Sequence, residues 1–369
     1  MKIGILTFHA SHNYGSVLQN YALQQFLIAE GHSVETINLR NSKQKYMYHY
    51  PLHIGRRSPS LKFLLGRFLD PFWLVKECRR WNIFESFLSN SLVLTRECDN
   101  WHAVREVITE RQFDAVIVGG DQIWNPFCYD FDWSYFLPDK LYPIKKIAFS
   151  PSMGNSLGRI KEDEELVAKI KQYLFDIYPI SVREDDARDY LHNLLGRDIP
   201  VVADPVFLPG LSTYLNLIGD PIIKEPYIYY YTPSHITDYD AEKKAIELAE
   251  SLGLRIITSY SHFLRRSPMK CVVSGPAEFL NLVSNAQIVI GKSYHLVLFS
   301  LLFHKEFVTV NSGMDSRVRS LINHLNVPEG NIESVEDYFK LTHIDYNAVD
   351  KEVRKYRDQS ILYLRDALS

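Results

Sequence analysis

Short apolar runs alternate with amphipathic stretches along most of this chain, and this alternation is typical of parallel α/β proteins. Residues 2–7 form the first apolar run, residues 17–30 carry apolar side chains at helical spacing, and a second apolar run follows Gly31 at 33–38. The pattern predicts further strands at 114–118, 146–149, 180–183, 201–203, 227–231, 255–258, 287–290 and 308–310. It predicts further helices at 75–90, 101–110, 162–174, 185–195, 240–252, 276–284, 296–303, 317–325 and 349–367.

The length of 369 residues exceeds what one hydrophobic core usually serves, so we expect two domains. The alternating elements predict an α/β fold of two doubly wound, Rossmann-like domains that face each other across a cleft. We place the N-terminal domain at residues 1–175 and the C-terminal domain at 176–345, followed by a helix at 346–369 that could return to the N-terminal domain. Residues 41–100 break the alternation with many aromatic and basic side chains, which predicts an insertion that lines or covers a site.

Charge and cysteine content narrow the classes of function. Acidic residues outnumber basic ones by 44 to 41, so a formal net charge of −3 offers no basic surface for a nucleic acid. The four cysteines are far apart in the sequence, which favours a reducing cytoplasm over a disulfide framework or a zinc site. The chain opens on a strand pattern rather than a signal peptide, and no apolar run approaches the roughly 20 residues of a membrane span.

One histidine stands where a strand, a turn and a helix meet. In the segment AQIVIGKSYHLVLFSLLF, a short apolar strand pattern is followed by a turn signal at 291–293 and by an apolar helix, so His295 lies at or near a helix N-terminus. Unpaired N–H groups and the positive end of the helix dipole favour a bound anion there. A titratable side chain beside that anion could act as acid or base near neutral pH. The alternative is that His295 caps or packs the first helical turn.

A polar loop follows the first predicted strand. His12, Asn13, Tyr14 and Gly15 enter a helix that continues to Gln19, and such a loop can hold a phosphate or sugar hydroxyls. The loop lacks the G-x-G-x-x-G spacing of a dinucleotide-binding turn. The alternative is a simple capped turn.

A second polar loop ends the strand predicted at 114–118. Two glycines there permit the close approach of a ligand or of another backbone, and they are followed by Asp121, Gln122, Trp124 and Asn125. Asp121 could orient a hydroxyl or accept its proton, and Trp124 offers a flat face for a sugar ring. A Gly-Gly-Asp sequence is also common turn chemistry, so the alternative is again a structural turn.

Further strand ends supply polar groups. Ser152 follows one strand, and Arg183 ends another, where its guanidinium could bind a carboxylate or phosphate in bidentate fashion. The alternative for Arg183 is an ion pair with one of the acids at 184–186. Asp204 with the following proline indicates a turn, and Arg317 at a helix start could meet an anion or stay solvated.

Five blocks follow one another along the chain: NYGSVLQNYAL, FDAVIVGGDQIWNP, SVREDDARDYL, VADPVFL and IVIGKSYHLVLFSLLF. This ordered set resembles the polysaccharide pyruvyl transferase family over roughly residues 1–330. The resemblance implies a two-domain architecture similar to that of GT-B glycosyltransferases. It also implies transfer of an enolpyruvyl or ketal pyruvyl group from phosphoenolpyruvate to a sugar, in the cleft between the two domains.

The resemblance implies roles for individual residues. The family's functional histidine corresponds to His295, which would be the general acid that protonates C3 of phosphoenolpyruvate. The arginine of the SVRE block corresponds to Arg183, which would bind the donor. Many members carry an arginine two positions before the histidine, where this chain has Ser293 followed by Tyr294; both would face the donor, and Arg317 could replace the missing arginine.

The resemblance is less specific about the residues that would bind the sugar acceptor. Asp121 is our candidate for the group that orients or deprotonates an acceptor hydroxyl. The side chains expected to bind the acceptor sugar are His12, Asn13, Tyr14, Gly15, Gln19, Gln122, Trp124, Asn125 and Ser152.

The expected reaction forms a pyruvate ketal, 4,6-linked on galactose, in the repeat unit of a bacterial capsular polysaccharide or exopolysaccharide. Phosphoenolpyruvate is a co-substrate, and the scheme calls for no cofactor and no metal. The acceptor could be linked to polyprenyl diphosphate, in which case the insertion at 41–100 would approach the inner face of the plasma membrane. The alternatives are a GT-B-like glycosyltransferase that uses a nucleotide sugar and a non-catalytic protein of polysaccharide assembly. The oligomeric state is open.

Overall fold

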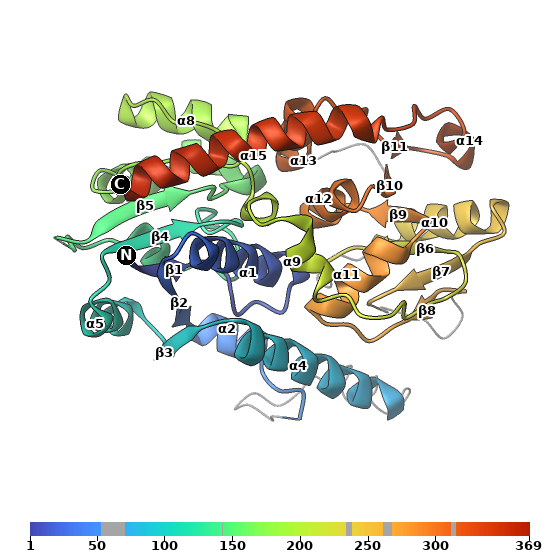
Figure 1. Cartoon of the computed structure of the whole chain (residues 1–369), viewed down its shortest axis with the longest axis horizontal. Coiled ribbons are helices and arrows are strands. Elements are labelled where there is room, and N and C mark those ends of the chain that lie inside the picture. Colours follow the sequence, from blue (N-terminus) through green and yellow to red (C-terminus); the bar gives the residue numbers. More distant parts are fainter. Residues whose placement is uncertain (53–70, 142, 234–237, 261–267, 311–314) are drawn as a thin grey trace.

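The computed structural model describes residues 1–52, 71–141, 143–233, 238–260, 268–310 and 315–369. Two parallel β-sheets lie side by side, each with helices packed on both of its faces (Figure 1). The predicted pair of doubly wound α/β domains is thus confirmed. Among the helices that the structure describes, none combines the length and the apolar character that crossing a membrane requires.

The first sheet has the strand order β3-β2-β1-β4-β5, and all of its neighbours pair in parallel. One face of the sheet is covered by α1 and the other by α5, because successive side chains of a strand point to opposite faces. The central strands are therefore apolar on both faces. The strands are β1 (Lys2–Leu6), β2 (Ser33–Leu39), β3 (Leu94–Cys98), β4 (Ala115–Gly119) and β5 (Lys145–Phe149).

The second sheet has the order β11-β10-β9-β6-β7-β8 and is also parallel throughout. Its central strand β6 is a run of buried tyrosine and isoleucine side chains, YIYYY. The strands are β6 (Tyr227–Tyr231), β7 (Arg255–Thr258), β8 (Lys270–Cys271), β9 (Ile288–Gly291), β10 (Glu306–Val310) and β11 (Asn331–Ile332).

The helices of the first half are α1 (Tyr14–Ala29), α2 (Ser42–Met47), α4 (Pro71–Ser91), α5 (Trp101–Arg111), α6 (Leu157–Lys161), α7 (Glu164–Leu174) and α8 (Asp185–Leu195). Those of the second half are α9 (Leu211–Leu215), α10 (Tyr239–Ser251), α11 (Pro276–Asn285), α12 (Tyr294–Leu302), α13 (Ser316–His324), α14 (Val335–Tyr338) and α15 (Tyr346–Leu368). Short 3-10 turns are η1 (Trp133–Phe136), η2 (Gly154–Ser156) and η3 (Pro205–Phe207).

The segment expected to open the second domain pairs with the first sheet instead. Ile180 forms a parallel bridge with Ala148 of β5, and Val182 forms one with Val201. The side chains of Ile180 and Val182 also belong to the core beneath that sheet. The expected start at residue 176 is therefore corrected, because a strand joins the sheet edge that it reaches first, and the second sheet begins only with β6.

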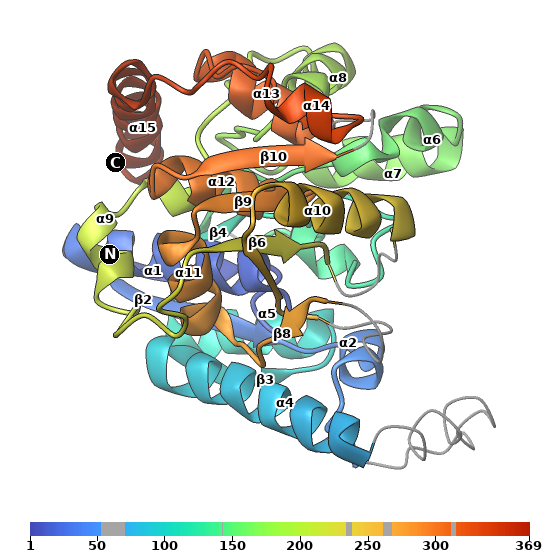
Figure 2. The ribbon, with the colours of Figure 1, turned by 90° about the vertical axis from the view of Figure 1, so that its right-hand side faces the viewer.

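The predicted insertion at 41–100 is corrected in a similar way. Its last part, β3, is the edge strand of the first sheet and pairs with β2. Polar side chains interrupt the apolar alternation of LTREC, which hides an edge strand from pattern reading. The remaining described residues of this stretch form α2 and α4, and α4 runs beneath both sheets in Figure 2. Residues 53–70 of the predicted insertion lie outside the described residues.

The two sheets are joined by one shared hydrophobic core. Tyr14 and Val17 of α1, Phe84 of α4, Phe279 of α11 and Phe299 of α12 are all buried in it. The ring of Tyr14 stacks on Phe84 at 5.3 Å and on Phe279 at 4.6 Å between centroids. The start of α1 is thus packed against both halves of the molecule.

The last helix, α15, spans both halves (Figure 1). Its first part buries Val349 and Tyr356 in the shared core, whereas its end buries Leu364 and Leu368 against the first sheet. Arg365 near its end forms a two-point ion pair with Glu30 of α1, at 2.6 and 2.9 Å. The final helix therefore returns to the N-terminal part of the chain.

Replacing Leu364 with alanine tests how much the packing of the end of α15 against the first sheet contributes to stability. The side chain is fully buried, so Leu364→Ala should lower the free energy of unfolding by about 2–5 kcal/mol. The matched control is Leu362→Ala, two positions away on the same helix and 58% exposed, which should change stability by less than about 0.5 kcal/mol. Urea denaturation measures both, and equal effects would show that the end of α15 is not docked.

Candidate active site

The polar side chains predicted at strand ends meet between the two sheets. Asp121 follows β4, Ser152 follows β5, and Arg183 ends the bridge segment at the edge of the first sheet. His295 follows β9 of the second sheet. Carboxyl ends of parallel strands are where α/β folds bind their ligands, and this position agrees with that rule.

His295 occupies the first turn of α12, whose N-cap residue is Ser293. Its side chain is buried, with the residue 6% exposed. The imidazole lies against the backbone of Gly15, since a Cβ added there would be 2.0 Å from Nδ1. On the other side, Nε2 lies 3.6 Å from Oδ2 of Asp204 and has no hydrogen-bond partner within the described ranges.

Asp204 is the central anion of the site. Its Oδ2 accepts a hydrogen bond from Nη1 of Arg183 at 2.7 Å, and its Oδ1 accepts one from the backbone N–H of Val206 at 3.0 Å. Burial alone would raise the pKa of Asp204, but the neighbouring His295 and Arg183 hold that pKa at about 2. The sequence indicated only a turn here. The turn exists as η3, and the carboxylate in addition joins the histidine to the arginine.

Arg183 keeps half of its guanidinium unpaired. Nη1 is held by Asp204, whereas Nε and Nη2 are buried without a hydrogen-bond partner in the described structure. Oδ1 of Asp121 is 3.9 Å from Nη2, and Oε2 of Glu184 is 4.0 Å from Nε, both beyond hydrogen-bond distance. The Nε–Nη2 edge is the fork that binds carboxylate or phosphate in bidentate fashion. The ion-pair alternative is confirmed for Glu184, whose Oε2 is 4.0 Å from Nε, and the closer ion pair is the one with Asp204.

Glu184 is fully buried behind this fork. Its Oε1 accepts hydrogen bonds from Ser152 Oγ at 2.8 Å and from the backbone N–H groups of Met153 and Gly154 at 2.8 and 3.2 Å. Burial raises the pKa of Glu184, and the nearby Arg183 opposes that rise. Ser152, which we expected to contact the acceptor, therefore donates its hydroxyl hydrogen bond to the buried carboxylate of Glu184.

Asp121 sits in a strained turn. Its φ of +48° follows a φ of +66° at Gly120, and left-handed backbone is uncommon at a non-glycine residue. The side chain accepts a short hydrogen bond from Ser16 Oγ and one from the N–H of Gln122 at 2.8 Å. The residue is 7% exposed, so its carboxylate is held near Arg183 with little access to bulk water.

Tyr294 lies between the two arginines of the site. The Cζ atom of Arg183 is 4.3 Å from its ring centroid, and that of Arg317 is 5.7 Å away. The fork of Arg317 is occupied, because Nε donates to Asp315 at 2.7 Å and Nη2 makes a short contact with the same carboxylate. Arg317 thus reaches the site, but it is paired there.

Three residues expected to bind the acceptor are core residues. Trp124 is fully buried, stacks on Phe136 and donates to the backbone oxygen of Tyr135 at 3.2 Å. Tyr14 is buried in the shared core, as described above, and Gln19 is fully buried and donates to Thr7 Oγ1 at 2.8 Å. Trp124 and Tyr14 satisfy their polar atoms inside the core, whereas Oε1 of Gln19 is buried without a hydrogen-bond partner in the described structure. The contact of these three residues with a sugar stays a prediction.

The other acceptor candidates lie on the rim in two groups. Asn13 caps α1 by accepting from the N–H of Gly15 at 2.9 Å, and His12 Nε2 is 2.9 Å from Oε1 of Glu85. In the second group, Asn125 donates to Gln122 Oε1 at 3.0 Å. A Cβ at Gly154 would approach that same oxygen to 2.1 Å, so the pair rests on the turn after β5.

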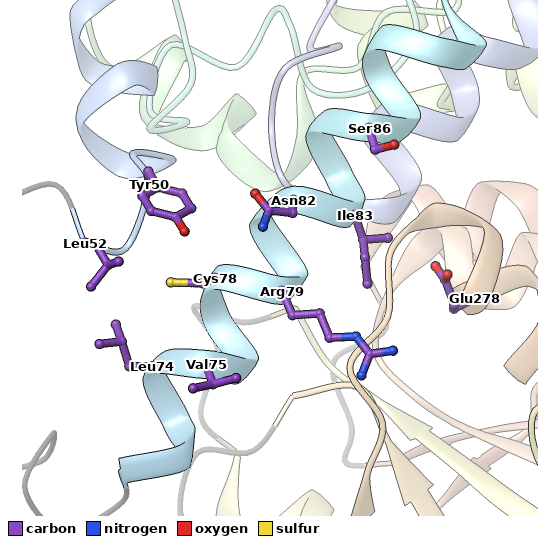
Figure 3. A pocket seen from close by; sticks show the side chains of 10 residues that line it. All are labelled: Tyr50, Leu52, Leu74, Val75, Cys78, Arg79, Asn82, Ile83, Ser86 and Glu278. Atoms are coloured by element: carbon purple, nitrogen blue, oxygen red, sulfur yellow. The ribbon is translucent and has the colours of Figure 1, made fainter.

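A groove with a volume of about 810 Å³ lies elsewhere, along α4 (Figure 3). It is bounded by Tyr50 and Leu52 on one side and Glu278 of α11 on the other. None of the residues predicted for catalysis lines it. The site is therefore recognised by its buried unpaired polar atoms and not by its volume.

The described part of the chain holds no group of three or more His, Cys, Asp or Glu side chains placed to bind a metal ion.

Comparison with solved structures defines the class of fold. A UDP-GlcNAc 2-epimerase from Rickettsia bellii matches with a TM-score of 0.56 at 10% identity, covering 100% of this chain and 96% of that one. The enzyme from Methanocaldococcus jannaschii matches at 0.53 and 12%, covering 97% and 93%. The Neisseria meningitidis enzyme bound to UDP-GlcNAc matches at 0.53 and 11%, covering 98% and 100%. The predicted GT-B-like architecture is confirmed, and identities this low show the fold alone.

The family model for polysaccharide pyruvyl transferase matches residues 13–313. The chain belongs to this family, as the ordered motifs predicted, and it is a transferase of polysaccharide biosynthesis. Among curated proteins, none matches the chain significantly.

Sequence reasoning named Glu184 as a possible ion-pair partner of Arg183 and Asp204 as a turn residue, but it assigned neither of them, nor Asp315, to the site. Each is an acid beside a residue that we did single out, and all three are buried or half-buried in ion pairs with arginine. The acidic residues that follow successive strands could have indicated this site. The sequence does not show which arginine each acid pairs with, because that depends on which strand ends lie close together.

The contact between Gly15 and His295 can be tested directly. Gly15→Ala places a Cβ 2.0 Å from the imidazole, so the ring must move, and the free energy of unfolding should fall by about 1–3 kcal/mol. Gly158→Ala is the control, since Gly158 lies in α6 with nothing within 4 Å of an added Cβ, and it should not destabilise. Urea denaturation gives the stabilities, and NMR of labelled histidine should show a displaced His295 signal in Gly15→Ala only.

Proposed function

We propose that this chain transfers the pyruvyl group of phosphoenolpyruvate to two hydroxyls of a sugar and releases phosphate. The observation that carries the proposal is the buried, unpaired Nε–Nη2 fork of Arg183 in the same site as the imidazole of His295. A buried guanidinium whose Nε–Nη2 edge makes no hydrogen bond, with Asp121 and Glu184 at 3.9 and 4.0 Å, suits the carboxylate or phosphate of this donor. A buried imidazole nearby suits proton transfer to carbon.

In the proposed reaction His295 donates its proton to C3 of phosphoenolpyruvate, and positive charge develops at C2. One sugar hydroxyl adds to C2 and passes its proton to the imidazole of His295, which restores the starting charge of the site. The second hydroxyl then displaces phosphate from C2, and its proton leaves with the phosphate. The product is a cyclic ketal that carries the new methyl group. Arg183 and the N–H groups at the start of α12 stabilise the donor's negative charge throughout.

For the acceptor we propose Asp121 as the group that orients the attacking hydroxyl, since its carboxylate is held near Arg183 by Ser16 and the N–H of Gln122. A galactose that receives a 4,6-linked ketal in a capsular polysaccharide or exopolysaccharide is the acceptor that we propose. No cofactor takes part in this scheme.

The rival function is glycosyl transfer from a nucleotide sugar. In its favour, the M. jannaschii and N. meningitidis epimerases of similar fold are described with UDP-GlcNAc bound. Against it, the motifs that match the family model include the segments of Arg183 and His295. A nucleotide-sugar enzyme should bind UDP-GlcNAc and leave phosphoenolpyruvate intact.

The decisive measurement is phosphate release from phosphoenolpyruvate with nitrophenyl or lipid-linked galactosides. His295→Ala should lower the rate by about 10²–10⁴-fold, the usual contribution of a general acid. Arg183→Lys keeps a charge but removes the fork, so it should raise the KM for phosphoenolpyruvate.

The control for these variants is His102→Ala on α5, whose side chain is 82% exposed, and it should retain the full rate. Undiminished release by His295→Ala would refute its catalytic role. Binding of UDP-GlcNAc without any phosphate release would support the rival function.

We also propose that the acceptor is linked to polyprenyl diphosphate, with the groove along α4 next to the apolar chain. Val75 and Leu52 line this groove and are 64% and 54% exposed. A single exposed apolar side chain is ordinary on a protein surface, but two in one groove favour an apolar ligand.

A charge in the groove tests this role. Val75→Glu should weaken association with liposomes that contain polyprenyl phosphate, because a carboxylate is costly to place in an apolar contact. Turnover of a water-soluble acceptor should be unchanged. Val93→Glu, at a position 50% exposed outside the groove, is the control and should associate like the wild type. Equal liposome association of all three proteins would refute this role of the groove.

A further inference from the structure

One carboxylate oxygen is shared by the two groups on which the proposed reaction depends. Oδ2 of Asp204 lies 2.7 Å from Nη1 of Arg183 and 3.6 Å from Nε2 of His295. The carboxylate and the guanidinium are almost fully buried, with side-chain exposures of 0% and 1%, and the imidazole is 7% exposed. Charges in such surroundings interact strongly, because little water screens them.

We propose that Asp204 is a positioning residue that fixes His295 and Arg183 relative to each other and places its negative charge beside the imidazole. This inference rests on the proposed function and deepens it. An anion within about 4–6 Å favours the charged form of a histidine, which is the form that can donate a proton to carbon. The same oxygen accepts a hydrogen bond from Nη1 of Arg183 and leaves Nε and Nη2 without one.

The other groups around His295 do not supply this anion. Gly15 of α1 presents backbone, and the ring of Tyr294 of α12 lies at 86° to the imidazole with 5.2 Å between the two ring centroids. Tyr214 of α9 and Tyr356 of α15 face Asp204, and burial raises the pKa of both phenols, so they are neutral. Asp121 and Glu184 lie behind Arg183 and face its guanidinium.

Asp204 could instead have a purely structural role. Its Oδ1 caps η3 by accepting from the N–H of Val206 at 3.0 Å, and that bond alone could explain an aspartate before a proline. Asp204→Asn preserves the shape and this acceptor oxygen but removes the negative charge. The variant therefore separates the charge from the cap.

We expect Asp204→Asn to remain folded and to lower kcat by at least about 100-fold. The alkaline limb of the pH profile of kcat should move to lower pH by about one unit or more, because the imidazolium loses its proton more easily without the anion. The KM for phosphoenolpyruvate should rise as well, because Arg183 loses its anchor. A variant that is slower only in proportion to a loss of folded protein, with an unmoved pH profile, would overturn the proposal.

The matched control is Asp185→Asn. Asp185 is also a carboxylate between a histidine and an arginine, 3.3 Å from His324 and 2.8 Å from Arg188, and these partners hold its pKa at about 2 although burial opposes this. It lies at the start of α8 and makes no contact with His295. Asp185→Asn should cost stability without moving the pH profile. A shift as large as that of Asp204→Asn would also overturn the proposal.

A second readout does not depend on turnover. NMR of labelled histidine follows the titration of the His295 imidazole in the wild type and in Asp204→Asn. The midpoint should fall by about one unit or more in the variant. If the wild type releases no phosphate from phosphoenolpyruvate, the proposed function fails, while this titration still decides whether Asp204 acts on His295. An unchanged midpoint would refute the action of Asp204 even in an active enzyme.

Discussion

The burial of the Asp204 carboxylate is the constraint on which the rest of this site depends. Removing an ion from water costs several kcal/mol unless charged and hydrogen-bonding partners replace the water. Here the partners are Arg183, the N–H of Val206 and the neighbouring His295. They come from the edge of the first sheet, from η3 and from the start of α12. Both hydrogen bonds to this carboxylate come from Arg183 and Val206, and the 3.6 Å contact with His295 links the second sheet to the same charge.

The same arrangement leaves other polar groups unsatisfied. Nε and Nη2 of Arg183, Nε2 of His295 and Oε2 of Glu184 are buried without hydrogen-bond partners in the part of the chain described. Unpaired buried groups are costly, and native proteins keep them chiefly where function uses them. The backbone at the ends of β4 and β5 is also strained, with φ of +48° at Asp121 and +58° at Ser150. A ligand that supplied hydrogen bonds to these groups would offset their cost and thereby gain affinity.

Much of the fold could be predicted from local sequence, because helix and strand differ in the spacing of apolar residues. The strand at 227–231 and the helix entered at Tyr294 are examples. The prediction failed at β3, where an edge strand needs only a partial apolar pattern, and at 180–201, where the pattern was right but the assigned sheet was wrong. Choice of sheet is a long-range decision that local periodicity does not contain.

For the site, the sequence alone determined that His295, Arg183 and Asp121 stand at strand ends, since strand, turn and helix signals are local. The tertiary structure decided the rest. It joined Arg183 to Asp204 across 21 positions, enclosed Trp124 in the core and put Gly15 against His295. Each of these outcomes depends on how two sheets pack, because burial and ion pairing are settled between segments that are distant in sequence.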